Sequence, residues 1–398
     1  MTLAINIDAH YTSKIYTTGS RITGSVSLFP KSDAAIQSIQ IALVGTSRTR
    51  VDSLPAPRVT NHVFLTLDMP ITKASRPSVQ DLEGGSPQNI PFRFIIPHTL
   101  PRDPCETSRG AGQLRDQHLR LPPTMGTWEK DDLAPTMARV DYAVVARVFQ
   151  RRSSGTDHAV EQSQPIKVLP MFPMDPPLSI TPQDTRYKLE RTKLFRRRVL
   201  SARKERITVT TAQPEAVRLG VDGHHAPGSW TSVMLDLNFE SSSPSFMPPE
   251  ALTIQMSLES QTWYAAAPIR TLPDLGNPRD STGLRHELRY STTTKLSRTQ
   301  AEGMAWTRKS AAAEWALSSW RAKVKVPIHL PTTHKLFLPT FYGCFVSRSY
   351  MLHISVESNG TSLNLSVPVQ IATQSPHLNV LGESLEDPPS FESALAWR

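Results

Sequence analysis

The sequence predicts an all-β protein built from two tandem antiparallel β-sandwiches. Apolar residues recur at every second position in many short segments, and this spacing places them on one face of a strand. The 34 prolines and 18 glycines predict frequent turns and disfavour long helices. The alternating segments form two successive sets, and a proline-rich stretch at 170–182 separates them. We therefore expect two β units joined by a stiff connector.

The clearest strand is Arg139–Phe149. One face of this segment carries five residues: Val140, Tyr142, Val144, Ala146 and Val148. Such a long and regular alternation, rich in β-branched residues, is typical of a strand with one face in a core. We expect this strand in the middle of a sheet.

The remaining strands of the first unit show the same alternation. They are expected at Leu3–Ile7, Ile22–Leu28, Ile39–Gly45, Val63–Leu67, Phe92–Ile96 and Ile166–Val168. The polar stretches Thr46–Asn61 and Asp81–Asn89 predict loops, and Gln113–Leu121 predicts one short helix before a proline pair.

The second unit repeats this pattern. Its strands are expected at Ile207–Val209, Val233–Phe239, Leu252–Leu258, Leu284–Tyr290, Trp320–Leu330, Tyr350–Val356 and Leu363–Ile371. The last two strands flank Asn359-Gly360, a pair that favours a tight hairpin. Ser297–Ser319 predicts a long loop. The expected units are 1–169, a connector with a basic run at 170–206, a second sandwich at 207–373 and a disordered tail at 374–398.

The net charge of +9 is concentrated in Tyr187–Arg206, which contains nine Lys or Arg residues and only two Glu. A cluster of this kind beside a connector suits an anionic membrane surface or the acidic, phosphorylated tail of a partner. The expected contacts are Lys193, Arg196, Arg197, Arg198, Arg203 and Lys204. The alternative is a solvated, partly helical linker. Nucleic acid is a poorer match, because no aromatic residues interleave the charges in a recognisable binding module.

No constellation of catalytic, cofactor-binding or metal-binding residues is apparent in the sequence. Two cysteines, Cys105 and Cys344, leave a bridge between them open, but one pair is not the framework of a secreted disulfide-rich protein. His224-His225 lacks a third ligand at metal-site spacing, and Asp131-Asp132 is typical of a turn. With no apolar run of about 20 residues and no signal-like start, we expect a cytoplasmic protein.

Several segments of the chain resemble the arrestin-like proteins of filamentous fungi, which are related to the α-arrestins. The resemblance spans both units and is carried by Tyr16–Gly24, Ile41–Arg48, Leu119–Thr124, Asp132–Arg139 and Leu338–Phe341, with Cys344, Ser347 and Arg348. It implies an arrestin N-terminal-like and a C-terminal-like domain, each an immunoglobulin-like β-sandwich.

The resemblance also implies a non-enzymatic adaptor. Such proteins bind membrane cargo, namely transporters or receptors, and link it to ubiquitin-dependent endocytosis at the plasma membrane or endosomes. They recruit WW-domain ubiquitin ligases of the HECT class through Pro-Pro-x-Tyr motifs. In this chain Pro388, Pro389 and Phe391 occupy the corresponding place, with Phe where the motif has Tyr. The missing hydroxyl costs roughly 0.5–1.5 kcal/mol of hydrogen bonding, so either weakened docking or a merely disordered proline pair is expected.

One further group of charged residues suggests a link between the two units. Arg139, Asp141 and Arg147 suit a buried ion network of the kind arrestins use between domains, and exposure on the surface is the alternative. Two other functions fit the same pattern: a trafficking scaffold resembling the arrestin-like subunit of retromer, without a ligase, and a β-sandwich enzyme or sugar binder.

Overall fold

The computed structural model describes residues 2–29, 34–52, 55–70, 88–102, 104–105, 112–152, 157–172, 178–195, 205–241, 246–276, 287–309, 318–358 and 360–374. Strands in several sheets make up most of this part of the chain, which confirms the all-β prediction. The described residues contain one short helix, α2 (Gly112–His118), at the place where the sequence predicts one.

Residues 2–172, called the N half, form two sheets. The smaller sheet has the order β1 (Thr2–Ile7), β3 (Arg21–Phe29) and β6 (Gln88–Ile95). The larger has the order β2 (Ile15–Tyr16), β8 (Asp157–Val168), β7 (Ala138–Arg152), β4 (Ala34–Val51) and β5 (Arg58–Asp68). The clearest predicted strand is β7, and it lies in the middle of its sheet, as expected.

The alternation in β7 decides which side chains enter the core of the N half. Its inward face carries the five residues named above, all of them almost completely buried. They pack with inward residues of the smaller sheet, such as Val26, Leu28 and Phe92. Each such side chain stabilises the fold by about 1.5–3 kcal/mol when it leaves water, so the sequence period determines how the two sheets face each other.

Residues 178–374, called the C half, form two larger sheets and one parallel strand pair. One sheet has the order β15 (Thr307–Lys309), β16 (Ser318–Pro327), β12 (Ser232–Ser241), β10 (Glu205–Thr211) and β9 (Glu190–Phe195). The other has the order β14 (Leu288–Glu302), β13 (Ala251–Tyr264), β18 (Val346–Ser358) and β17 (Phe341–Tyr342), and β19 (Thr361–Val369) also pairs with β18. The parallel pair is β11 (Val217–Leu219) with β20 (Ile371–Thr373).

The predicted hairpin is present. β18 and β19 are antiparallel, and Ser358 pairs with Thr361 across the turn. Gly360 has a φ of 78°, in the left-handed region that glycine tolerates without a steric penalty. The Asn-Gly signal therefore correctly predicted a hairpin between these two strands.

Two predicted loops are wrong. β4 continues to Val51 and β5 begins at Arg58, so most of Thr46–Asn61 is strand. Its polar residues include Thr49, which is buried against the C half and therefore breaks the usual link between polarity and exposure. β14 and β15 likewise occupy much of Ser297–Ser319. β14 is an edge strand with mostly polar side chains, so it lacks the apolar alternation of a strand in the middle of a sheet.

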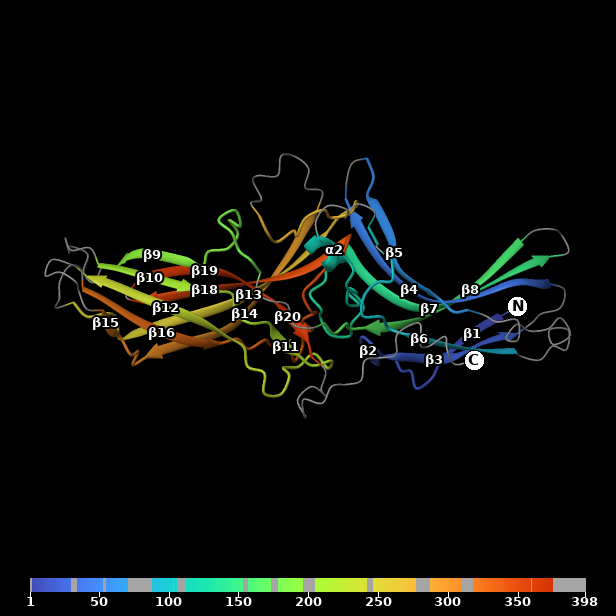
Figure 1. Ribbon diagram of the computed structural model, residues 1–398, viewed down its shortest axis with the longest axis horizontal. Coiled ribbons are helices and arrows are strands. Elements are labelled where there is room, and N and C mark those ends of the chain that lie inside the picture. Colours follow the sequence, from blue (N-terminus) through green and yellow to red (C-terminus); the bar gives the residue numbers. More distant parts are fainter. Residues whose placement is uncertain are drawn as a thin grey trace.

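The molecule is elongated, with β1–β8 gathered toward one end and most of β9–β20 toward the other (Figure 1). Helix α2 and the β11–β20 pair lie near the middle. Within the described part of the chain, no helix has the length and apolar character needed to cross a membrane.

Candidate functional site

Arg348 lies at the contact between the N half and the C half, which we call the junction. Its side chain, on β18, is fully buried, with a relative exposure of 0%. Nη1 donates to the carbonyl of Asp132 at 3.0 Å, and Nη2 donates to the carbonyl of Leu133 at 3.2 Å. Nε donates to Thr262 Oγ1 within the C half. The planar guanidinium thus ties a C-half strand to an N-half loop through several directed bonds.

The loop that accepts these bonds is itself held in shape by Asp131 and Asp132. Asp132 accepts from the backbone N–H groups of Gly126 and Ala134, and Asp131 accepts from that of Leu133. Leu133 has a φ of 58°, a left-handed conformation that costs energy for a branched residue. The two carboxylates act as turn residues, as the sequence indicates, and they aim the carbonyls of Asp132 and Leu133 at Arg348.

Further contacts extend the junction. Thr49 Oγ1 donates to the carbonyl of Ala265, and the N–H of Leu336 donates to the carbonyl of Asp131. Apolar residues of the C half also join the core of the N half: Tyr264, Leu336, Leu338, Phe341, Phe345 and Val346. The two halves therefore share packed surface rather than meeting only through a connector.

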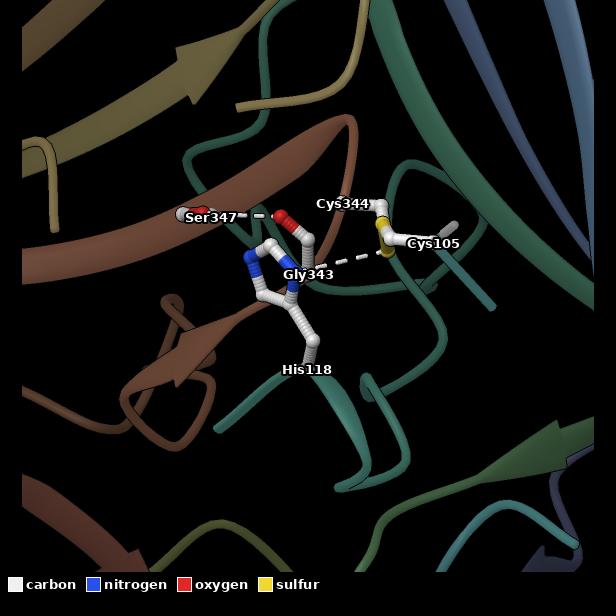
Figure 2. The surroundings of a disulfide bond; sticks show 5 residues. All are labelled: Cys105, His118, Gly343, Cys344 and Ser347. Carbon is white, nitrogen blue, oxygen red and sulfur yellow. Dashed lines mark hydrogen bonds between the residues drawn. A yellow bond between two sulfur atoms is a disulfide. The ribbon is translucent and has the colours of Figure 1, made fainter. Parts of the chain in front are cut away.

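A disulfide crosses the junction. Cys105 of the N half is bonded to Cys344 of the C half, with Cα atoms 6.4 Å apart and a sequence separation of 239. Both cysteines are buried. The ring of His118 faces this bridge, with Nδ1 3.6 Å from Cys344 Sγ (Figure 2). The bridge left open by the sequence is therefore formed, and it joins the two halves covalently.

A groove of about 530 Å³ lies on the N half, beside the start of β7 and the end of β8. We define the groove by six of its lining residues: Tyr11, Trp128, Glu129, Arg139, Asp141 and Lys167. Tyr11 is exposed at this site, and aromatic and Arg side chains are enriched in sites that bind proteins.

The groove is ordered by its own contacts. Lys167 Nζ pairs with Glu129 at 2.8 Å and lies 5.6 Å from the centre of the Trp128 ring. Trp128 Nε1 donates to the carbonyl of Thr124 at 2.6 Å. Because these side chains are held before any partner arrives, binding there loses less conformational entropy.

Asp274 is a buried acid of the C half. Asp274 Oδ2 accepts a hydrogen bond from the Tyr342 hydroxyl at 2.7 Å. Burial raises the pKa of Asp274 above its usual value, and the bond from Tyr342 opposes this shift only in part.

The structure places the predicted ion-network residues within one sheet. Arg139 pairs with Asp141 on β7 at 2.6 Å, and Arg147 pairs with Glu161 on β8, also at 2.6 Å. All four side chains are substantially exposed, so among the described residues these pairs follow the surface alternative. Two other charged side chains bridge the halves: Arg348, and Lys130, whose Nζ donates to the carbonyl of Thr332 at 3.3 Å.

Most residues of the two other predicted sites lie outside the described residues. This applies to Arg196, Arg197, Arg198, Arg203, Lys204, Pro388, Pro389 and Phe391. Lys193 is described: it lies on β9, opposite Ile207 of β10, and it is exposed. Part of the basic run is therefore strand rather than a helical linker.

Sequence reasoning missed two features of the junction, the burial of Arg348 and the position of His118, and it left a third, the pairing of the cysteines, open. Each depends on residues more than 200 positions apart. Asp132–Arg139 and the segment from Leu338 to Arg348 lie far apart in sequence. The structure brings these two segments into contact.

No model of a protein family matches the chain, and no curated protein matches it.

Proposed function

We propose that this protein is a non-enzymatic arrestin-like adaptor made of two tandem immunoglobulin-like β-sandwiches. In this role it binds membrane cargo, namely transporters or receptors, and delivers it to ubiquitin-dependent trafficking. One observation carries the proposal: the segments of the arrestin-like resemblance that lie far apart in sequence meet at the junction, where Arg348 bonds to the carbonyls of Asp132 and Leu133.

The groove is the proposed cargo site. It offers an exposed aromatic ring at Tyr11 and charges of both signs, which suit a polar peptide with apolar anchors. The basic run is the proposed contact to anionic lipid or phosphorylated tails, and Lys193 gives it one exposed cation on β9. The tail residues Pro388, Pro389 and Phe391 are the proposed ligase contact.

Proximity labelling in cells tests the proposal. We expect the full chain to label transporters or receptors together with a WW-domain ubiquitin ligase. The double substitution Tyr11→Ser and Arg139→Ser alters two solvent-facing residues of the groove, so it should remove cargo labelling and retain ligase labelling. Trp230→Ser is the matched control, because Trp230 is an equally exposed aromatic residue on the C half.

The ligase contact is tested separately by titrating tail peptides with a WW domain. Phe391→Tyr should tighten binding by roughly fivefold to tenfold, because it restores a hydrogen bond of about 1 kcal/mol. Equal affinity of the two peptides would remove the motif from the proposal.

Other labelling patterns would favour a different function or refute part of the proposal. A stable coat complex without a ligase would favour the retromer-like scaffold over the ligase adaptor. Cargo labelling that survives the groove substitutions would refute the groove as the cargo site. Labelling of neither cargo nor coat would refute the adaptor proposal itself.

A further inference from the structure

Three potential metal ligands meet at the junction. Cys105, His118 and Cys344 are all buried, and one ligand atom from each lies within 4.8 Å of the others. They come from three places: the segment before α2, the last residue of α2, and the turn between β17 and β18. The buried cluster thus draws on both halves of the chain.

The separation of Cys344 Sγ and His118 Nδ1 fits two ligands of a tetrahedral thiophilic cation, and reduction of the disulfide frees Cys105 Sγ to move to a third position. Zinc bonds of about 2.3 Å to sulfur and about 2.0 Å to nitrogen, at a tetrahedral angle, place the two ligand atoms about 3.5 Å apart. The observed separation of Cys344 Sγ and His118 Nδ1 is 3.6 Å. Figure 2 shows the His118 ring next to the disulfide, with a dashed line joining the ring to a sulfur atom.

The surroundings supply room for a fourth ligand. A cavity of about 20 Å³ is lined by His62, His118 and Cys344, and this volume suffices for one water. His62 Nε2 is buried and has no hydrogen-bond partner among the described residues. A buried imidazole nitrogen of this kind is available either as a ligand or as the partner of a bound water.

We propose that the reduced form of the Cys105–Cys344 pair, together with His118, is a binding site for Zn²⁺ that cross-links the two halves. Water or His62 completes the coordination. The disulfide and the metal are alternative cross-links at the same place, so the junction stays joined in both oxidising and reducing surroundings. This inference does not depend on the proposed adaptor function.

The exchange between the two forms balances. A dithiol reductant gives two electrons and two protons to the disulfide, which becomes two thiols while the reductant becomes a disulfide. Zn²⁺ then displaces both thiol protons into solvent and is held by two thiolates and the neutral imidazole. A phosphine with water performs the same reduction and is converted to a phosphine oxide.

The test is metal binding by the full chain, reduced with a phosphine under anaerobic conditions. Co²⁺ serves as the spectroscopic probe and Zn²⁺ as its competitor. We expect one Co²⁺ per chain, with the charge-transfer absorption of thiolate ligands, and stoichiometric displacement by Zn²⁺. The oxidised wild-type protein should bind none at this site, and it is a folded control that needs no substitution.

Variants identify the ligands. The double substitution Cys105→Ser and Cys344→Ser should abolish the thiolate absorption. His118→Gln should weaken binding by more than the roughly 10–100-fold that the loss of an outer-shell partner costs. His98→Gln, at an exposed histidine outside the cluster, should leave affinity unchanged.

Two results would overturn the proposal. One is a reduced wild-type protein that binds no more Co²⁺ than its oxidised form. The other is thiolate-free metal binding that persists in the double cysteine variant, since this would place the metal elsewhere.

Discussion

Arg348 is a buried cation whose described hydrogen bonds go to neutral acceptors. Three of them belong to the N half: the carbonyls of Asp132 and Leu133 and the sulfur of Met125. Replacing Arg348 by an apolar residue leaves each buried acceptor unsatisfied, at a cost of about 1–3 kcal/mol per acceptor. The same replacement removes the free-energy cost of burying the positive charge, and this effect stabilises the variant. The balance of these terms decides how strongly Arg348 holds the junction.

We expect Arg348→Met to lower the free energy of unfolding by about 2 kcal/mol or more, because two carbonyls lose their donor while most of the volume is kept. Urea unfolding measures the change. Arg321→Met, at an exposed position on β16, is the control and should alter stability by no more than about 0.5 kcal/mol. A gain in stability for Arg348→Met would show that the cost of burying the charge outweighs the hydrogen bonds.

Asp274 makes stability depend on pH. Burial raises its pKa in the folded protein, so the folded state holds this proton more tightly than the unfolded chain does. The unfolded chain releases the proton first as pH rises. The contribution of Asp274 to stability is therefore full below its unfolded pKa and is lost as pH rises through the folded pKa.

Asp274→Asn should stabilise the protein at neutral pH, because asparagine can still accept the Tyr342 hydrogen bond without carrying a buried charge. The difference in Tm from wild type should shrink as the pH is lowered from about 7 into the acidic range, because Asp274 in the wild type becomes protonated. Calorimetry across this range measures it. If Asp274→Asn were less stable than wild type at neutral pH, the surroundings of the ionised carboxylate would stabilise it by more than its burial costs.

At the scale of elements, the pairing of β1 with β3 depends on Gly24. Gly24 lies opposite Ile7, and a Cβ added there would approach the Asn6 carbonyl oxygen and the Phe92 ring far inside van der Waals contact. Neither neighbour can move without shifting a strand or the packed core. The close approach of the two backbones therefore requires glycine.

Gly24→Ala should destabilise the protein by about 1–3 kcal/mol and speed amide hydrogen exchange in β1 more than in β7. Gly112→Ala is the control, because an added Cβ there meets nothing within 4 Å. Uniform protection across β1 in the Gly24 variant would contradict the prediction.

The sequence allowed good prediction of strands that bury one face and poor prediction of the others. β7 was clear because five of its side chains alternate into the core. β14 was not, because it is an edge strand whose polar side chains carry no period. The Thr46–Asn61 region was assigned as a loop because it is mostly polar, and its buried polar residue Thr49 contacts a surface that only the folded C half provides.

The candidate sites were less predictable than the strands, for the same reason. Arg139 and Asp141 were singled out from the sequence, and they line the groove, but Trp128 and Lys167 come from other segments. Arg348, Cys105, His118 and Cys344 acquire their environment only when the halves meet. No local pattern records which distant residues will surround a side chain.

For the whole molecule, the junction decides whether the halves unfold separately. Domains joined by a linker move and unfold independently unless their interface is large and apolar. Here Leu336, Leu338, Phe341 and Val346 of the C half belong to the core of the N half. Leu133 of the N half belongs in turn to the core of the C half. This mutual exchange of core residues couples the two halves.

The Cys105–Cys344 bond strengthens this coupling, because it closes a loop between residues with a sequence separation of 239. Confining so long a segment of the unfolded chain is worth about 5 kcal/mol in the chain-entropy model. We expect reduction in the presence of a chelator to lower the free energy of unfolding by up to about 5 kcal/mol. The double substitution Cys105→Ser and Cys344→Ser should produce the same loss. Because the exchanged core residues remain after reduction, calorimetry should still show one cooperative transition. Two separate transitions in the reduced protein would mean that the covalent bond alone, and not the packing at the junction, makes the halves unfold together.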